Sequence, residues 1–286
     1  MPSESAGTSI YACYGDATVN TSQEHASGTW DANYQGVWHM TGSTGSSSTD
    51  STANNYTGTD VGSTVAIAGE IDGARSFNGT SQGVNIGDKT NLKCTNNDFT
   101  VSTWFDITSA TATSGKVIFG KGTPSAVSPY YLEYGANNTS TIDFRTGASG
   151  CATRLETYTQ FKATTSINQW MSFVVTKQAT SELMYRNGVA VTSFALSSST
   201  ICNNTQPATI GYNGTTYFFP GYVDEARLSN SARSPSWILT EYNIEKAPDA
   251  AQFTTTGFYT VGAQTALTTS TPSATLLVDA LCFSSE

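Results

Sequence analysis

The chain has 286 residues, of which 38% are hydrophobic, so it can bury a core as one large β domain or as two smaller domains. Only 12% of its residues are charged, about half the usual share, and Ser, Thr and Asn take their place. The net charge of −9, with 13 scattered Lys and Arg residues, argues against binding to nucleic acids or to anionic membranes. No apolar run is long enough to span a membrane, so membrane insertion is not expected.

The first residues, Met1 to Ser5, carry neither the basic region nor the apolar region of a signal peptide. Two origins remain open: a domain cut from a longer exported protein, or a virion protein that needs no export. The first predicts an extracellular or cell-surface location, and the second predicts a location on the virion surface.

Short runs of β-branched and aromatic residues alternate with clusters of Gly, Asn, Ser and Thr, while helical periodicity is almost absent. This pattern predicts an all-β protein. The polar stretch 41–62 predicts a long loop after the first strand. Strands are expected at residues 36–40, 74–78, 99–105, 116–120, 130–134, 141–145, 170–176 and 182–186.

Two local signals follow in the second half of the chain. Asn187 and Gly188 separate two apolar runs, and this dipeptide favours a two-residue hairpin because both turn positions need a positive φ. Ser234 followed by Pro235 predicts the N-cap and first residue of a short helix that ends near Lys246. The apolar face of this helix comprises Trp237, Ile238 and Tyr242.

Several segments occur in the order found in one family. They read TWDANYQGVWHM at 29–40, GARSFNG at 73–79, FTVSTW at 99–104, NQW at 168–170, YRNG at 185–188, GYVDEARL at 221–228 and SARSPSW at 231–237. Over about residues 11 to 262 the chain resembles the laminin G-like domains of bacterial and phage surface proteins, in the concanavalin A-like lectin/glucanase superfamily. The resemblance implies an all-β, two-sheet antiparallel jelly-roll sandwich with one short C-terminal helix.

This resemblance divides the chain into three parts. Residues 1–34 form an N-terminal segment at the edge of the domain, residues 35–248 form the sandwich, and residues 249–286 form a C-terminal β tail. The apolar run 275–283 in the tail leaves two arrangements open, pairing with the chain's own N-terminal segment or with a neighbouring subunit. The predicted core comprises Trp38, Phe77, Val101, Trp104, Ile118, Trp170, Phe173, Val175, Met184, Ile210, Val223 and Leu228.

No catalytic residues are expected. Glycoside hydrolases of the superfamily carry Glu-x-Asp-x-x-Glu on one strand, and the nearest match, Glu70 with Asp72, has Arg75 in place of the third carboxylate. Asp224 and Glu225 are adjacent, so on a regular strand they point to opposite faces. His39 lies in a predicted core strand, where a structural role is the better interpretation.

A structural calcium ion is the candidate cofactor. Concanavalin A-like sandwiches often hold calcium where the long N-terminal loop meets a late strand, and the matching residues are Asp50, Asn55 and Asp224. The alternative also stays open: Asp50 caps a turn, and Asp224 accepts backbone hydrogen bonds or pairs with Arg227.

Loop aromatics beside amide side chains are the candidate ligand-binding residues, since flat rings stack on sugars. They are Tyr130, Tyr131, Tyr212, Asn213 and Tyr217. Packing in the core is the alternative role for each. Of the cysteines, Cys13, Cys94, Cys151, Cys202 and Cys282, at most four can form disulfides, and the sequence does not fix which.

Three functions are compatible with these observations. The first is a non-catalytic recognition or adhesion module that binds a glycan or another surface polymer. The second is a structural subunit of a virion or extracellular filament, which assembles with identical subunits. The third, a glycoside hydrolase, lacks its carboxylate motif. Fold alone does not decide between the first two.

Overall fold

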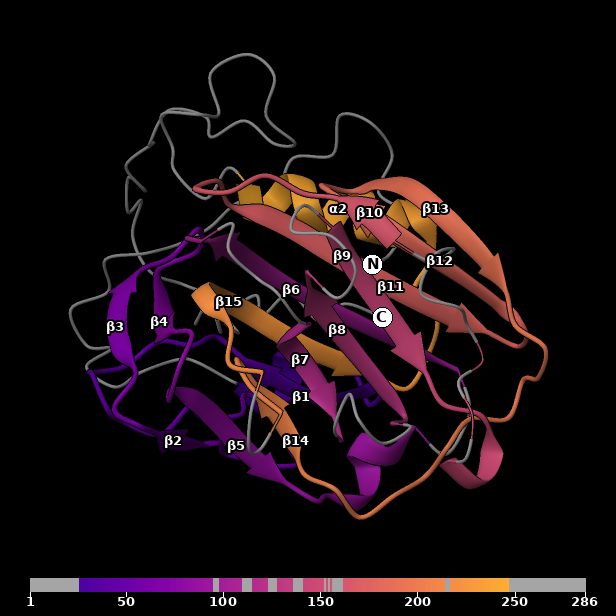
Figure 1. Ribbon diagram of the computed structural model, residues 1–286, viewed down its shortest axis with the longest axis horizontal. Coiled ribbons are helices and arrows are strands. Elements are labelled where there is room, and N and C mark those ends of the chain that lie inside the picture. The colour runs from indigo at the N-terminus through magenta and orange to yellow at the C-terminus, as the bar shows by residue number, and fades with distance from the viewer. Residues whose placement is uncertain are drawn as a thin grey trace, which may run out of the picture.

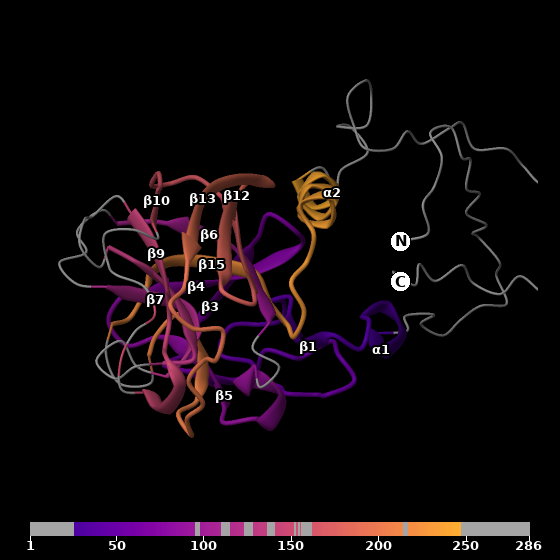
Figure 2. The same cartoon turned by 90° about the vertical axis from the view of Figure 1, so that its right-hand side faces the viewer.

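The computed structural model describes residues 26–94, 98–109, 115–122, 128–135, 141–151, 153, 155, 162–213 and 217–246. Two antiparallel sheets pack face to face, and one helix lies outside them (Figures 1 and 2). The predicted all-β jelly-roll sandwich with a short C-terminal helix is therefore confirmed. Residues 1–25 and the tail 249–286 lie outside the described residues, so the predictions for both remain predictions.

The first sheet has eight strands in the order β13-β12-β11-β6-β15-β4-β3, with β1 also paired to β15. The first half of β15 pairs with β4 and its second half pairs with β1. The register shifts between Asp224 and Arg227, where Glu225 has a φ of 50°. The strand bounds are β1 Tyr34–Trp38, β3 Val65–Ala68, β4 Gly73–Asn78, β6 Phe99–Ile107, β11 Met171–Gln178, β12 Ser181–Arg186, β13 Val189–Ala195 and β15 Pro220–Ser229.

The second sheet has seven strands in the order β10-β9-β8-β7-β14-β5-β2. Their bounds are β2 Thr59–Val61, β5 Gly83–Gly87, β7 Lys116–Lys121, β8 Tyr130–Tyr134, β9 Thr141–Thr146, β10 Lys162–Thr164 and β14 Ala208–Ile210. Short helical turns flank the sheets at α1 Ala26–Thr29, η1 Thr90–Lys93 and η2 Ser149–Cys151. A disulfide joins Cys151 to Cys202, and Cys94 is a buried free thiol.

The core lies between the sheets and contains ten of the twelve predicted residues. Eleven of the twelve predicted side chains are at most 3% exposed. Trp104 is buried on the outer face of its sheet, where its ring stacks on that of Tyr242. The second exception is Trp170, which is only half-buried. It immediately precedes β11, where Met171 and Phe173 are buried against the other sheet. Since side chains alternate along a strand, Trp170 points to the outer face.

The hairpin and the helix form where the sequence predicts them. Asn187 and Gly188 link β12 to β13 with φ angles of 52° and 76°. Helix α2 spans Pro235–Lys246, and the hydroxyl of Ser234 accepts a hydrogen bond of 3.2 Å from the amide of Trp237. The helix lies on the outer face of the eight-stranded sheet (Figure 2). There Ile238 is buried against Val174 and Tyr185.

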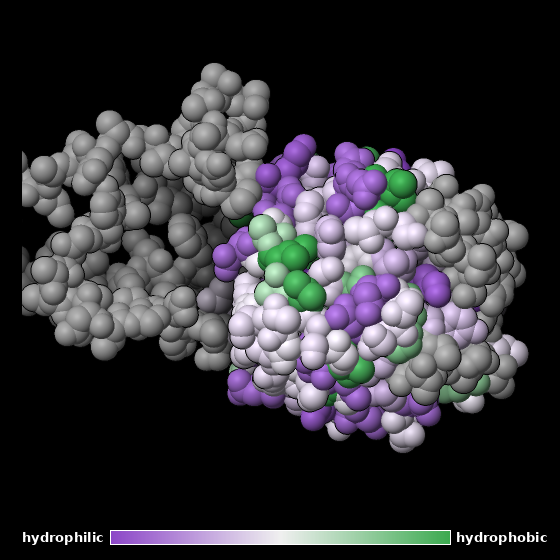
Figure 3. Space-filling model, turned by 60° about the vertical axis from the view of Figure 1, so that its left-hand side comes forward, coloured by the Kyte–Doolittle hydropathy of each residue, from purple (hydrophilic) through white to green (hydrophobic). Residues whose placement is uncertain are grey.

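The visible surface mixes polar and apolar residues. In Figure 3 apolar side chains form small separate patches among polar ones rather than one continuous area. Among the described helices, none has the length and apolar character needed to cross a membrane. The edge strand β3 carries one of the more exposed apolar side chains, Val65, which is 43% exposed.

Candidate functional site

The predicted calcium ligand Asp50 is engaged by the loop that contains it. Its carboxylate accepts hydrogen bonds from the amides of Val37 at 3.0 Å, Thr52 at 2.9 Å and Tyr56 at 2.8 Å. The hydroxyl of Thr52 donates a further bond of 3.0 Å to the same carboxylate. Asp50 is buried, so these contacts fix the loop against β1. This is the turn-capping role that the sequence left open.

The other two predicted ligands have different partners. Asp224 is fully buried on β15, where its Oδ2 accepts a hydrogen bond of 2.9 Å from the amide of Ile71. Asn55 is exposed and donates to the carbonyl of Ala53. Within the described ranges, no group of three or more His, Cys, Asp or Glu side chains is arranged to hold a metal. The described geometry does not assemble these three residues into one shell, and calcium binding stays a prediction.

Four of the five predicted ligand-binding residues are buried. Tyr130 points into the core, where its hydroxyl donates to the carbonyl of Leu92 at 3.0 Å. Tyr212 stacks on Phe218 with ring centroids 5.5 Å apart. Tyr131 and Asn213 are also at most 2% exposed, whereas Tyr217 is half-exposed. Their ligand-binding role stays a prediction, and their contacts in this structure are those of packing residues.

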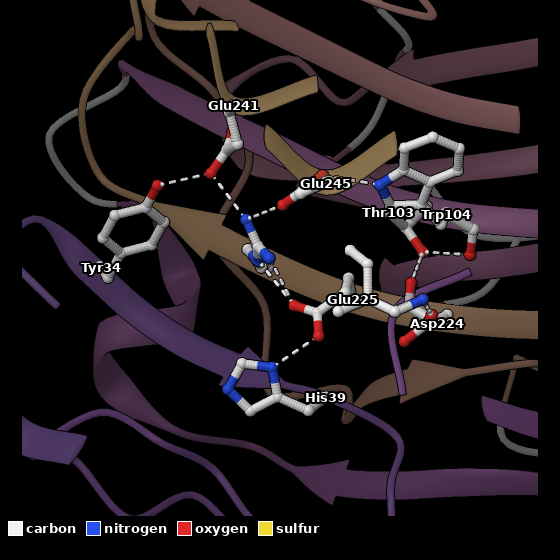
Figure 4. Close-up of polar contacts among 10 residues, drawn as sticks. Tyr34, His39, Thr103, Trp104, Asp224, Glu225, Glu241 and Glu245 are labelled. Atoms are coloured by element: carbon white, nitrogen blue, oxygen red, sulfur yellow. Dashed lines mark hydrogen bonds and ion pairs between the residues drawn. The ribbon is translucent and has the colours of Figure 1, made fainter. Parts of the chain in front are cut away.

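A charged cluster under α2 was not found from the sequence. Arg227 of β15 lies at its centre and forms ion pairs with Glu225, with Glu241 at 2.6 Å and with Glu245 at 2.5 Å (Figure 4). The indole of Trp30 lies 5.1 Å from the guanidinium carbon. The Arg227 cluster therefore joins the central strand of the eight-stranded sheet to two successive turns of α2.

Three further side chains surround the Arg227 cluster. The Nδ1 atom of His39 lies 2.6 Å from Glu225, and the hydroxyl of Tyr34 donates to Glu241 at 3.2 Å. The indole nitrogen of Trp104 donates to Glu245 at 2.6 Å (Figure 4). The expected structural role of His39 is thus matched by a contact with a buried carboxylate at the end of β1.

The pKa values of the carboxylates in this cluster are driven apart. Burial disfavours the ionised form of Glu225, but the charges of Arg227 and His39 outweigh burial and lower its pKa to about 2. Burial raises the pKa of Glu245 to about 7 against the attraction of Arg227. Such a split is typical of paired acids and bases. However, the hollow between these residues has room for about one water molecule, so a sugar ring does not fit.

The bulge in β15 changes one argument made from the sequence. Regular alternation would place Asp224 and Glu225 on opposite faces, but the register shift and the positive φ of Glu225 break that alternation. Burial and the charge of Glu225 raise the pKa of Asp224 to about 8. The two carboxylates therefore interact, and the hollow that Glu225 lines has room for about one water molecule.

A second polar cluster lies on the other sheet, on the face opposite the core. Tyr131 of β8 is registered with Arg145 of β9, and Glu133 is registered with Asp143. The guanidinium of Arg145 lies 5.5 Å over the ring of Tyr131 and pairs with Glu133. All four side chains are buried. The alternation of polar with apolar residues in 130–134 and 141–145 is the sequence signal for this second face.

A half-buried aromatic pair lies at one end of the eight-stranded sheet. The rings of Trp170 and Tyr222 are 6.2 Å apart between centroids, at an angle of 39°. They lie beside Asp106, which is two residues beyond Trp104 on the same face of β6. This aromatic surface is therefore next to the area that α2 covers. The apolar run 170–176 predicts a buried Trp170, so this surface is not expected from the sequence.

Comparison with solved structures places this fold among several sandwich domains. Domain 4 of the extracellular arabinanase AbnA from Geobacillus stearothermophilus, solved with arabinotriose, matches with a TM-score of 0.54 and 19% identity, over 73% of this chain and 97% of that one. The binding domain of Paraclostridial Mosquitocidal Protein 1 matches with a TM-score of 0.57 and 12% identity, over 74% of this chain and 52% of that one. Trypanosoma rangeli sialidase matches with a TM-score of 0.52 and 14% identity, over 77% of this chain and 34% of that one.

The chain thus spans nearly all of the arabinanase domain, about half of the toxin chain and a third of the sialidase chain. A search among curated protein sequences finds no match. A laminin G-type family model, described as the concanavalin A-like lectin/glucanases superfamily, matches residues 77–239. This match covers more than half of the sequence, and the two sheets are those of the family fold. The chain therefore belongs to the concanavalin A-like lectin/glucanases superfamily.

Proposed function

We propose that this chain is a non-catalytic carbohydrate-recognition module of an extracellular or virion surface. The observation that carries the proposal is its match to 97% of a domain that was solved with arabinotriose. Similar sandwiches occur in the binding domain of a mosquitocidal protein and in botulinum neurotoxin type C, whose cell entry depends on interaction with two ganglioside molecules. A sandwich of this size is therefore compatible with a complete glycan-binding unit.

The described carboxylates support binding rather than hydrolysis. Retaining and inverting glycosidases need two carboxyl groups on either side of a glycosidic bond, with room for the sugar between them. In the Arg227 cluster the guanidinium occupies the space between the carboxylates. In the partial hydrolase motif, Arg75 replaces the third carboxylate and is buried, donating to the carbonyl of Ser43 at 2.6 Å. Neither arrangement provides a dyad that faces a substrate.

The test is a glycan array followed by isothermal titration calorimetry on the best-bound oligosaccharide. We expect saturable binding of at least one glycan. Reducing-end assays on laminarin, carrageenan, agar and xylan should release no product above buffer. Absence of binding on the array and to insoluble polysaccharides would overturn the recognition function. A product ladder that disappears in the Glu70→Gln variant would overturn the non-catalytic part.

A further inference from the structure

A row of side chains crosses the outer face of the eight-stranded sheet next to α2. Val65 of β3 is registered with Ser76 of β4, Ser76 with Tyr222 of β15, and Tyr222 with Asp106 of β6. The amide of Gln169, just before β11, donates to Asp106 at 2.7 Å. Since registered residues on neighbouring strands share one face, this row is continuous across the sheet.

The row presents an aromatic surface to solvent. The neighbours Val223 and Met171 are at most 3% exposed and point into the core, so Tyr222 and Trp170 point outward. Their rings lie 6.2 Å apart at an angle of 39°, and both are half-buried, so each presents part of its ring to solvent. Two tilted rings side by side form a shallow apolar surface of the kind that packs against the C–H groups of a pyranose or furanose.

Polar groups surround this aromatic pair. Asp106 holds the loop before β11 by accepting a hydrogen bond from the amide of Gln169. The amide of the preceding residue, Asn168, donates to the carbonyl of Ile107 at 2.8 Å. The side chains of Asn168 and Gln169 are exposed at the rim. Amide groups both donate and accept hydrogen bonds, as sugar hydroxyls require. The loop is thus fixed by its backbone while its side chains remain available.

Charge decides the class of glycan. Asp106 lies within the row and the whole chain carries a net charge of −9, whereas Glu70, in the turn that joins β3 to β4, interacts with the charge of Lys246 in α2. These negative charges repel uronic-acid and sialic-acid polymers. Aromatic faces and amides without an adjacent Arg or Lys in the row match an uncharged sugar chain.

We propose that the Trp170 face, formed by Trp170, Tyr222, Asp106, Gln169 and Asn168, binds an uncharged glycan. This site rests on the proposed carbohydrate-recognition function and assigns it to one surface. Trp170 and Tyr222 contact the sugar rings, and Asp106 is a positioning residue that holds the loop carrying Trp170.

The experiment is affinity gel electrophoresis of the full chain in gels that contain arabinan, xylan, laminarin or agarose, with polygalacturonate as the acidic probe. At least one uncharged polysaccharide should retard the wild-type chain, and polygalacturonate should not. Trp170→Ala and Tyr222→Ala should each weaken that retardation about tenfold in affinity. Trp170→Phe keeps an aromatic ring and should therefore lose less affinity than Trp170→Ala. It replaces Trp170→Ala in the test if that variant fails to fold.

The matched control is Trp237→Ala. Trp237 is also half-buried, but it stacks on Arg233 at 4.7 Å and contacts Tyr34, which is registered with Ser229 at the opposite end of β15. This variant should bind like the wild type.

If Trp170→Phe and Tyr222→Ala retain full affinity, the site is wrong and the recognition function stands. Stronger retardation by polygalacturonate overturns the uncharged class. If no probe retards the wild type and the array is blank, the function itself fails. Loss of a dimer without loss of glycan affinity would make this face a self-association surface and overturn the proposal.

Discussion

Asp224 is a carboxylate that the fold buries completely. Gly69 allows the β3–β4 turn to close over it, because a Cβ at residue 69 would lie 2.4 Å from Oδ2. The amide of Ile71 donates to Oδ2, and Oδ1 has no hydrogen-bond partner among the described residues. Burial and the nearby charge of Glu225 raise its pKa to about 8. The protonated form therefore fits the folded chain better than the ionised form.

This gives a pH dependence with a definite sign. The folded pKa of Asp224 is about 8 and the unfolded pKa is near 3.8, so between these values the folded state holds a proton that the unfolded state has released. Its contribution to stability is present below pH 3.8 and is lost as the pH rises through 8. Asp224→Asn cannot ionise, so the variant should lose this slope and should melt at a higher temperature than the wild type at pH 9.

The measurement is thermal unfolding by circular dichroism at pH 5, 7 and 9 and constant ionic strength. Glu245→Gln is the companion variant, because burial raises the pKa of Glu245 to about 7. The stability that protonated Glu245 contributes is also lost as the pH rises, but the loss is complete at a lower pH than for Asp224. A wild-type melting temperature that does not fall relative to that of Asp224→Asn between pH 5 and pH 9 would contradict the assignment.

The docking of α2 on the sheet depends on one arginine. Arg227 is 8% exposed and pairs with Glu241 and Glu245 of the helix as well as with Glu225 of its own strand. Removing one partner of a buried ion-pair network leaves uncompensated charges, which costs about 3–5 kcal/mol. Arg227→Gln should therefore lower the free energy of unfolding by that amount in urea denaturation.

The matched control for this substitution is Arg186→Gln. The guanidinium of Arg186 donates to the carbonyl of Thr164 at 2.7 Å and lies nearer the surface. Its replacement should cost less than about 1 kcal/mol, as for other surface contacts. Equal losses in the two variants would mean that the Arg227 cluster does not dock the helix.

Features that depend on neighbouring residues were predicted from the sequence, whereas features that depend on distant contacts were not. The hairpin at Asn187 and the helix after Ser234 were predictable because turn and capping chemistry is local. The run of aromatic residues at 130–134 also predicted β8 with its observed bounds. The short strands β2, β3 and β5 were missed because runs of three to five residues are too short to show a periodic pattern and their pairing is set by other parts of the chain.

The candidate sites were less predictable than the fold for the same reason. The run from Trp170 to Val175 is apolar on both faces, so alternation divides it into two sets without indicating which set meets solvent. The bulge at Glu225 leaves no signal in the residue types, and it decides which carboxylates meet Arg227. Three of the four hydrogen bonds that Asp50 accepts come from backbone amides, which every sequence contains.

A disulfide between distant residues closes a long loop of the chain. Cys151 and Cys202 are 51 residues apart in sequence. Closing a loop of this length lowers the entropy of the unfolded chain by an amount equivalent to about 4 kcal/mol at 25 °C. The double variant Cys151→Ser, Cys202→Ser should lose stability of that order in urea denaturation under oxidising conditions.

Reductant provides the control for the disulfide. Wild-type protein treated with dithiothreitol should unfold at the same urea concentration as the double variant, and the double variant should not respond to the reagent. An unchanged midpoint for the reduced wild type would mean that the bond does not contribute to stability.

The position of β15 in the sheet also bears on how the chain is synthesised. This strand is the last described strand in sequence, yet it lies at the centre of the eight-stranded sheet and pairs with β1, β4 and β6. On the ribosome the earlier strands therefore emerge before the strand that joins them. We expect folding to be completed only after residue 229 has emerged from the ribosome. Folding should then be slow, as in other chains whose contacts join residues far apart in sequence. Until then the strands that have already emerged remain unpaired and need protection from aggregation.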